Sequence, residues 1–366
     1  MKYDNQLRYA VSIVQQYDGR FPMSAWLKDF FRENKQMGSR DRKTVAHLVY
    51  SYYRLGHCKF PTIEERIRSS MAICSNTPPE LLEYFKPAIP DTISSSCIFP
   101  WIDSLSEDMD KEAFAVSFLK QPDLFLRLRP GKENTVLEKL DAAGLAYQKI
   151  EDRAISLPNA TRADTILEIN KEAVIQDLSS QRTGKFMQAL KAVSAWDCCA
   201  ASGGKSIMAF DLIPDIQLTV SDIRPSIIHN LHERFREAGI KTYDSFTANL
   251  TDPDYDLPGN KYDLIIADVP CSGSGTWART PEQLLFFQQD KIHYYSELQR
   301  NILQKVIPAL KPGGILLYIT CSVFKQENEE AVEFVIDNSI LKCTAMEIIK
   351  GYNEKADTMF AATFTY

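Results

Sequence analysis

The chain has 366 residues, of which 45% are hydrophobic and 25% are charged, a composition typical of globular proteins with two or three domains. No apolar run reaches the roughly 18 residues that span a bilayer, and the first residues lack the apolar core of a signal peptide. A membrane-spanning protein is therefore excluded, and we expect a cytoplasmic one. The net charge of −6 is unevenly spread, because residues 1–70 carry +6 and the remainder −12. A basic first region favours contact with a polyanion such as RNA, although a solvated helical face would have the same charge.

Eight cysteines are scattered along the chain without a repeated CxxC spacing. A chain of this length needs no disulfide scaffold. We therefore expect reduced thiols, most of them in the core, and no metal centre.

The N-terminal region is predicted to be helical, with apolar residues at helical spacing in residues 7–17, 23–32 and 40–55. In the third segment Val45, Leu48 and Val49 begin a buried stripe, with Ser39 as a candidate N-cap. Three basic residues lie in its first turn: Arg40, Arg42 and Lys43. Positive charge opposes the helix dipole there, so a phosphate is a candidate ligand. The alternative is that these side chains are merely solvated beside Asp41.

A small α+β module is predicted next. Residues 74–130 are rich in Pro, Ser and Asp and predict loops and short helices. Beyond them, residues 124–128 and 154–157 are typical of strands, and residues 134–143 of a helix. We expect a helical, basic, RNA-interacting region over residues 1–120 and the module over residues 121–175.

From residue 176 to residue 366 strands and helices alternate, which predicts a doubly wound parallel sheet of the Rossmann-like α/β class. The expected strands are residues 193–199, 216–222, the run from Tyr262, and 314–320; the expected helices are residues 205–212, 225–238 and 297–310. Residues 343–348 and 359–366 are expected to form a pair of strands that closes one edge of the sheet.

The first of these strands runs through a small-residue turn, DCCAASGGKS, directly into a helix. Gly203 and Gly204 allow backbone to approach a ligand, and the helix start offers unpaired N–H groups. The turn fits neither GxGxxG nor the P-loop pattern. Asp222 ends the next strand, where a carboxylate can accept hydrogen bonds from both ribose hydroxyls. This arrangement favours an adenosine without phosphates, such as that of S-adenosylmethionine, over a purely structural turn.

Two thiols are expected at the carboxyl ends of neighbouring strands. Cys271 comes after the strand that ends near Asp268, and Cys321 comes after the next strand in sequence. Ligands bind at this edge of open α/β sheets, so the pair is a candidate catalytic site beside a methyl donor. The alternatives are two buried, inert cysteines or a disulfide, which a reducing cytoplasm disfavours.

The segments DCCAASGGK, DVPCSGSGTWARTPE, LKPGGILLYITCS and ENEE resemble the signature segments of the Sun/NSUN RNA (cytosine-5) methyltransferases, bacterial type. The similarity runs from Val174 almost to the C-terminus. More loosely, FLRLRPGKENTVLEKLDAAGLAY is similar to the small RNA-binding module of that family.

The resemblance implies an enzyme that transfers a methyl group from S-adenosylmethionine to carbon 5 of a cytosine in ribosomal or transfer RNA. Cys321 would be the nucleophile that adds to carbon 6, and Cys271 would help to release the adduct. Asp268 would bind the cytosine ring edge, and Lys205 would touch the cofactor and Asp268. The expected cofactor contacts are Cys199, Ala200, Ala201, Ser202, Gly203, Gly204, Lys205, Asp222, Asn249 and Asp268.

Further positions come from the same resemblance. Arg279 matches a basic residue that would contact phosphate, whereas Trp277 could stack on a base or belong to the core. Ser202 replaces the usual proline of the glycine turn, and Asn249 replaces an aspartate that meets the adenine; Asp252 is the alternative for that role. Two other functions stay open: a methyltransferase with a different acceptor, and a non-catalytic RNA-binding assembly factor.

Overall fold

The computed structural model describes residues 3–89, 93–188 and 193–366. The chain divides into two compact units. The first comprises residues up to 105, residues 109–122 and residues 276–289; the second comprises residues 106–108, 123–275 and 290–366.

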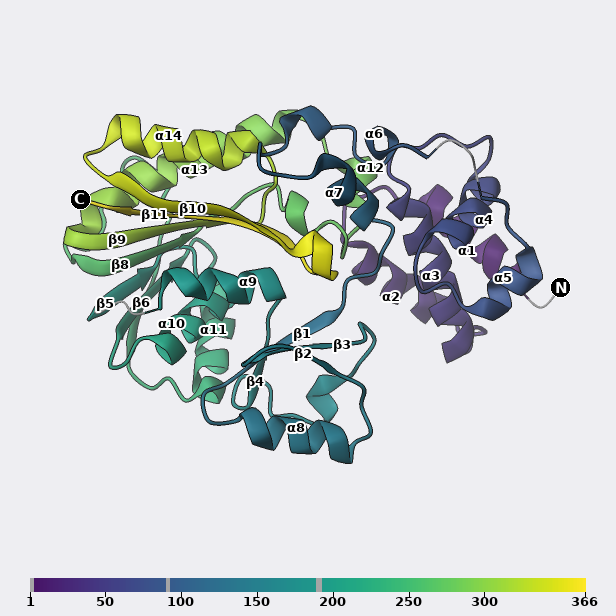
Figure 1. The fold of residues 1–366 in the computed structure, drawn as a ribbon, viewed down its shortest axis with the longest axis horizontal. Helices are drawn as coiled ribbons and strands as arrows, with labels where there is room; N and C mark the ends of the chain where they lie inside the picture. Colours follow the sequence, from purple (N-terminus) through teal and green to yellow (C-terminus); the bar gives the residue numbers. More distant parts are fainter. Residues whose placement is uncertain (1–2, 90–92, 189–192) are drawn as a thin grey trace. The chain divides into compact units, whose positions relative to one another are not determined.

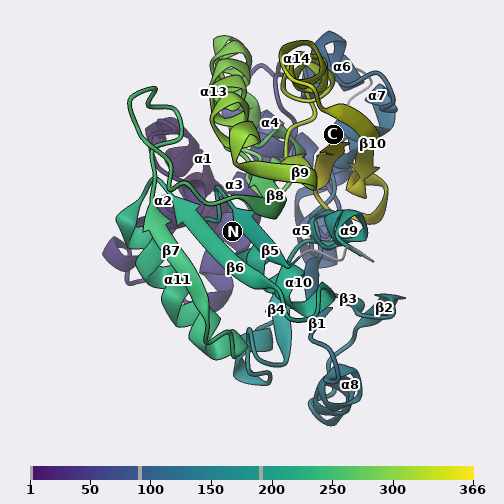
Figure 2. The ribbon, with the colours of Figure 1, turned by 90° about the vertical axis from the view of Figure 1, so that its left-hand side faces the viewer.

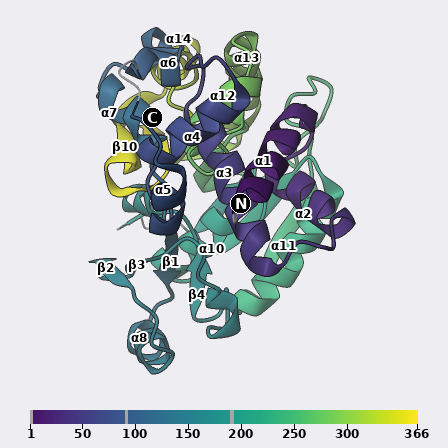
Figure 3. The same cartoon turned by 90° about the vertical axis from the view of Figure 1, so that its right-hand side faces the viewer.

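The first unit is helical (Figure 3). Its helices are α1 (Asp4–Gln16), α2 (Met23–Glu33), α3 (Ser39–Arg54), α4 (Ile63–Ile73), α5 (Pro79–Phe85), α6 (Ser95–Ile98), α7 (Lys111–Ser117) and α12 (Gln283–Phe286). The predicted stripe of α3 is confirmed, since Val45, Leu48 and Val49 are fully buried. The predicted N-cap is wrong by one residue: Gly38 is the N-cap, and its N–H donates to the Asp41 carboxylate at 3.3 Å.

Cys58 and Cys97 form a disulfide in this unit, which corrects the expectation that all eight cysteines are reduced. The loop after α3 lies against α6, where the N–H of His57 donates to the carbonyl of Cys97 at 2.7 Å. A side chain at Gly56 would collide with the backbone of Ile98. The 39-residue separation of the two cysteines matches no spacing rule, so the sequence alone did not reveal the pairing. The other six cysteines are free.

Residues 276–289 belong to the helical unit although they lie within the catalytic half of the sequence. The guanidinium of Arg54 donates to the carbonyl of Ala278 at 3.0 Å, and the carboxylate of Glu282 accepts from the N–H of Met23 at 3.1 Å. Trp277 is buried against Trp101 and Phe287. Trp277 therefore belongs to the core of this unit and is not available to stack on a base.

The α+β module is part of the second unit and contains a four-stranded antiparallel sheet in the order β2-β3-β1-β4. Its elements are β1 (Leu124–Leu128), α8 (Glu133–Ala142), β2 (Gln148–Glu151), β3 (Ala154–Leu157) and β4 (Ala173–Ile175). The predicted strands and helix are confirmed, whereas β2 and β4 were not predicted. Strand β2 is mostly exposed and lacks the apolar pattern by which strands are recognised, whereas β4 is apolar but has only three residues, too few to show a pattern.

A seven-stranded sheet forms the remainder of the second unit, in the order β10-β11-β9-β8-β5-β6-β7. Its strands are β5 (Ser194–Asp197), β6 (Gln217–Asp222), β7 (Tyr243–Thr247), β8 (Tyr262–Asp268), β9 (Leu310–Thr320), β10 (Lys342–Lys350) and β11 (Thr358–Thr365). β5 to β9 run parallel, and β10 and β11 are the antiparallel pair predicted at one edge.

Helices cover both faces of this sheet, as a doubly wound fold requires (Figures 1 and 2). One face carries α13 (Asp290–Val306) and α14 (Glu329–Asn338); the other carries α9 (Leu178–Arg182), α10 (Gly204–Leu212) and α11 (Pro225–Ala238). The Rossmann-like α/β fold class is therefore confirmed. The helix predicted to reach Leu310 ends at Val306 instead. Pro308, two residues further on, has no backbone N–H and cannot continue the helical hydrogen bonds. None of the described helices is long and apolar enough to cross a membrane.

Candidate active site

The two predicted rim cysteines lie side by side. Strands β8 and β9 are neighbours and parallel, with Asp268 paired with Ile319 at their carboxyl ends. Cys271 and Cys321 lie just beyond these ends, and their Sγ atoms are 3.3 Å apart. Both thiols are free and half-buried. The structure therefore contains neither a rim disulfide nor two fully buried core cysteines.

The two thiols of this pair are hydrogen-bonded to each other. That contact, burial and the nearby charge of Glu327 together raise the pKa of Cys271 well above its usual value. Cys271 therefore holds its proton tightly, and that proton can be directed at the Sγ of Cys321.

Glu327, which sequence reasoning did not single out, ties the two cysteine loops together. Its buried carboxylate accepts from the N–H of Ser272 at 2.8 Å and from the hydroxyl of Ser322 at 2.6 Å. The amide of Gln299 in α13 donates to it at 3.0 Å. Burial raises the pKa of this carboxyl. The only feature of the sequence that pointed to Glu327 was that it is the first residue of the segment ENEE.

Lys205 and Asp268 form the ion pair that the resemblance implied, with Nζ 3.0 Å from Oδ2. Lys205 is buried in the first turn of α10 and also donates to the hydroxyl of Ser180 at 2.7 Å. Asp268 is partly exposed beside the rim thiols. The ammonium therefore fixes the carboxylate while leaving part of it accessible.

The glycine turn leads from β5 to α10 in a conformation suited to small residues. Gly203 has φ +80°, and a Cβ there would come within 2.7 Å of the Phe235 ring. Ala201 has φ +45°, and its N–H donates to Asp222 at 3.1 Å. The N–H of Ala200 is bonded to the carbonyl of Ser221 at 2.9 Å. Cys199 is half-buried in the same turn. The turn is thus held against the end of β6.

Asp222 lies where the sequence placed it, at the end of β6, but its oxygens are engaged by Arg224. The side chain of Arg224 donates to Oδ1 at 2.9 Å and to Oδ2 at 3.1 Å. Burial raises the pKa of Asp222, but the hydrogen bonds from Arg224 outweigh it, so that the pKa is lowered. Because the side chain of Arg224 is 57% exposed, it can swing away when a ribose takes its place.

Ser202 and Asn249, the two residues that depart from the family pattern, both accept hydrogen bonds from nearby residues. The hydroxyl and carbonyl of Ser202 accept from Arg234 at 2.7 and 3.1 Å, so α11 holds the turn that a proline would have stiffened. Asn249 accepts from the N–H and hydroxyl of Thr251 through its Oδ1. The alternative, Asp252, caps its own loop by accepting from the N–H of Asp254 at 3.0 Å.

Asp197, the last residue of β5, is a buried acid behind the site. Its Oδ2 accepts from Ser206 at 2.6 Å, while its Oδ1 is buried without a partner. Burial, opposed by the Ser206 hydrogen bond and reinforced by the charge of Asp268, raises the pKa of Asp197 from 3.8 to about 7. The folded protein therefore retains a proton that the unfolded chain releases near pH 4.

This shift predicts a pH-dependent stability. Between about pH 4 and pH 7 the folded state binds the extra proton, so the free energy of unfolding falls as the pH rises, by about 4 kcal/mol in all. The substitution Asp197→Asn should remove this part of the slope and stabilise the protein above pH 7. Urea unfolding at several pH values measures the effect. Equal slopes in the two proteins would refute it.

The predicted RNA-contact residues lie in the helical unit. Arg40 and Lys43 are exposed, and Arg42 is half-buried, at the start of α3. Arg40 pairs with Glu80 at 3.1 Å, and Arg42 donates to the carbonyl of Met37 at 2.9 Å. Arg279 is half-buried. Their contact with RNA stays a prediction. Among the described residues, no group of three or more His, Cys, Asp or Glu side chains is placed to hold a metal ion.

Fold and site together define a Rossmann-like methyltransferase domain. Residues 186–362 match the family model described as 16S rRNA methyltransferase RsmB/F. The matched residues include most of the seven-stranded sheet and both rim cysteines, which confirms the resemblance of this part of the chain to Sun/NSUN proteins.

Curated relatives cover part of the chain. Ribosomal RNA small subunit methyltransferase B of Xylella fastidiosa (strain 9a5c) is 27% identical over 264 residues, or 69% of this chain and 62% of the relative. The probable enzyme of the same name from Bacillus subtilis (strain 168) is 28% identical over 204 residues, 55% of this chain and 46% of the relative. The chain thus spans less than two thirds of the length of these relatives.

Solved structures share the fold. The crystal structure of PH0851 has a TM-score of 0.76 at 17% identity, covering 99% of this chain and 98% of that one. NSun6 from Pyrococcus horikoshii, solved with SFG, has a TM-score of 0.62 at 14% identity, covering 73% of this chain and 97% of that one. At these identities the likeness shows the fold alone.

Proposed function

We propose that the protein is an S-adenosylmethionine-dependent methyltransferase that modifies carbon 5 of a cytosine in ribosomal or transfer RNA through a covalent cysteine adduct. The observation that carries the proposal is the pair of free thiols 3.3 Å apart at the ends of β8 and β9. The family of the domain and the names of its ribosomal RNA methyltransferase relatives support RNA as the substrate. A cytoplasmic location is part of the proposal.

The glycine turn and the end of β6 fit the cofactor. Gly203 keeps the turn open, and α10 begins at Gly204, where backbone N–H groups are not used by the helix itself. Asp222 offers two carboxylate oxygens for the ribose hydroxyls once Arg224 moves away. The bound cofactor supplies an electrophilic methyl group on a sulfonium.

Carbon 5 of cytosine is a poor nucleophile on its own, so one cysteine is needed to activate the ring. The second cysteine helps to release the adduct afterwards. The thiolate of Cys321 adds to carbon 6, forming a carbon–sulfur bond and moving an electron pair to carbon 5, which then takes the methyl group. A base, for which solvent water at the partly exposed rim suffices, takes the carbon 5 proton; the electron pair of that bond re-forms the ring double bond, the carbon–sulfur bond breaks, and Cys321 leaves as a thiolate. Cys271 holds its proton beside that sulfur and assists this release.

Asp268 completes the proposed site. Carbon 6 is a better electrophile when the ring edge of the cytosine is protonated, and the carboxylate of Asp268 favours that form by accepting a hydrogen bond from the protonated ring nitrogen. Lys205 holds Asp268 in position through the 3.0 Å ion pair. The target base must leave its stack to reach this rim, which favours single-stranded or distorted RNA.

Incubation of the protein with RNA and methyl-labelled S-adenosylmethionine tests the proposal. We expect label in 5-methylcytosine, located by bisulfite sequencing of ribosomal and transfer RNA. Label in protein or in another base would instead indicate a methyltransferase with a different acceptor. If no RNA fraction is labelled and calorimetry detects no cofactor binding, the protein is not this enzyme.

A further inference from the structure

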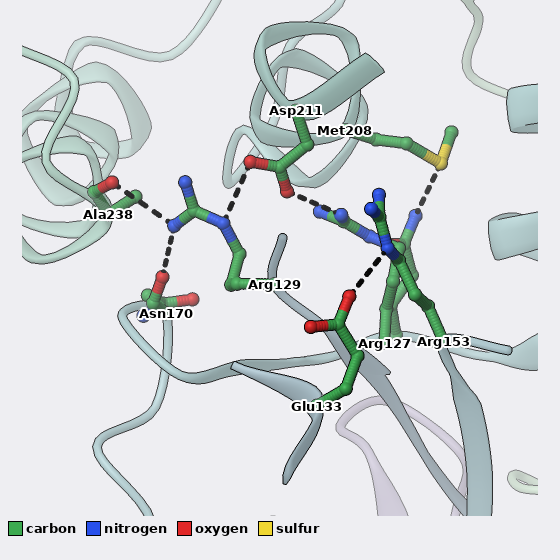
Figure 4. Close-up of polar contacts among 9 residues, drawn as sticks. Arg127, Arg129, Glu133, Arg153, Asn170, Met208, Asp211 and Ala238 are labelled. Carbon is green, nitrogen blue, oxygen red and sulfur yellow. Dashed lines mark hydrogen bonds and ion pairs between the residues drawn. The ribbon is translucent and has the colours of Figure 1, made fainter. Parts of the chain in front are cut away.

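A cluster of arginines connects the four-stranded module to α10 (Figure 4). Asp211 of α10 lies between two guanidinium groups: Arg127 Nη1 is 2.5 Å from its Oδ2, and Arg129 Nε is 2.8 Å from its Oδ1. All three side chains are at most 9% exposed. Two buried cations therefore share one buried carboxylate, which leaves an excess positive charge where burial makes charge costly.

The excess charge belongs to Arg127 rather than Arg129. Arg129 also donates to the carbonyls of Asn170 and Ala238. Arg127 donates through Nε to Gln176 at 2.8 Å, but its Nη2 is buried without any partner. A buried guanidinium nitrogen without an acceptor is unusual in a native protein.

Further arginines add to the positive charge. Burial lowers the pKa of Arg127; Asp211 opposes this shift, while the charges of Arg129 and, to a lesser extent, Arg153 add to it. Arg153 is 44% exposed and pairs with Glu133 at 2.8 Å. Burial and the charge of Arg127 lower the pKa of Arg234, and the charge of Glu237 opposes this shift. Acids thus offset part of the positive charge, but Nη2 of Arg127 still has no acceptor, which an anion could supply.

A cavity of about 360 Å³ adjoins Arg127 and Arg153. It lies between the β2–β3 turn, α9 and α10, with Gln181 and Gln188 among its lining residues. Two acids also line it: Glu151, which shares Arg182 with Glu354, and the exposed Asp152 of the turn. A second cavity of about 820 Å³, towards β10, shares Glu151, Gln181 and Gln188 but is lined by further acids, Asp108, Glu347 and Glu354, so only the first cavity is a candidate anion site.

We propose that the cavity beside Arg127 and Arg153 binds one backbone phosphate of the RNA substrate. This inference rests on the proposed function, which makes RNA the partner. Arg153, at the exposed mouth, bonds the phosphate oxygens directly after releasing Glu133. Arg127, at the floor, supplies the uncompensated charge. Because neither thiol lines the cavity, the contact holds the RNA backbone without reading a base.

The experiment compares Arg153→Gln and Arg127→Met with Arg162→Gln. Arg162 is an exposed arginine of the same module that pairs with Asp164, and it serves as the matched control. Arg127→Met leaves Asp211 paired with Arg129, so the fold should survive, and circular dichroism checks this. Arg153 is partly exposed, so Arg153→Gln should fold. It therefore tests phosphate binding in the cavity even if Arg127→Met misfolds.

Binding of a fluorescent single-stranded RNA is followed by anisotropy at several salt concentrations. We expect Arg153→Gln to weaken binding about tenfold at low salt and to reduce the slope of log K against log salt by roughly 0.7. Arg162→Gln should match the wild type. Addition of inorganic phosphate should raise the melting temperature of the wild type more than that of Arg153→Gln.

The outcomes separate this inference from the proposed function. If the wild type binds and methylates RNA while Arg153→Gln binds it with the same affinity and salt slope, the inference is wrong and the proposed function stands. If inorganic phosphate protects only the wild type but RNA binding is equal in all variants, the cavity takes a free anion and the inference is again wrong. If the wild type binds no RNA, both are wrong.

Discussion

Replacement of Cys321 by alanine is expected to abolish methyl transfer to RNA, with a fall in rate of more than about 10³-fold. Without its thiolate nothing adds to carbon 6, and carbon 5 is left too weak a nucleophile to take the methyl group. Incorporation of labelled methyl into RNA measures the rate. Binding of S-adenosylmethionine, measured by calorimetry, should change little because Cys321 is not among the proposed cofactor contacts.

A matched control for this substitution is Cys343→Ala. Cys343 is a free, half-buried thiol in β10 whose Sγ contacts the carbonyl of Ala345, and it takes no part in the proposed chemistry. Its variant should retain the wild-type rate. If Cys321→Ala kept more than about a tenth of the wild-type rate, the acceptor would not be a carbon that needs covalent activation.

Replacement of Asp268 by asparagine is expected to lower the rate of methyl transfer by about 10²- to 10⁴-fold, the range of general acid or base catalysis. Asparagine keeps the shape but loses the charge that pairs with Lys205 at 3.0 Å, and a neutral amide stabilises the protonated ring edge much less than a carboxylate does. Single-turnover rates with saturating RNA and cofactor isolate this effect from binding.

The ion pair provides the comparison for Asp268→Asn. If Lys205 acts only by orienting Asp268, Lys205→Met should cost less than Asp268→Asn, and the double variant should cost no more than Asp268→Asn alone. A rate for Asp268→Asn within about tenfold of the wild type would mean that the carboxylate serves the fold or the cofactor rather than the base.

The sequence predicted those site residues that lie at or just beyond the carboxyl ends of strands. Buried apolar runs located β8 and β9, and parallel neighbouring strands bring the residues after their carboxyl ends to one rim. The approach of Cys271 and Cys321 could therefore be anticipated. The Asp222 position and the glycine turn were predictable for the same reason. Each of these inferences uses only local pattern and one rule of topology.

Features that join distant segments could not be predicted in this way. Glu327 collects donors from residues 272, 299 and 322, and Asp211 joins two arginines more than 80 residues away. Neither Cys58 with Cys97 nor the inclusion of residues 276–289 in the helical unit obeys a spacing rule. Such contacts depend on side-chain packing, which a periodicity or a motif does not encode.

The most direct test of the proposed mechanism is to look for a covalent complex between the protein and RNA on denaturing gels in the presence of S-adenosylmethionine. Cys271→Ala should accumulate an RNA adduct, because Cys321 still attacks carbon 6 while release is impaired. Cys321→Ala should form none. If Cys271→Ala forms no adduct and Cys321→Ala does, the two thiols have the opposite roles; if neither variant nor the wild type forms one, the covalent mechanism is wrong.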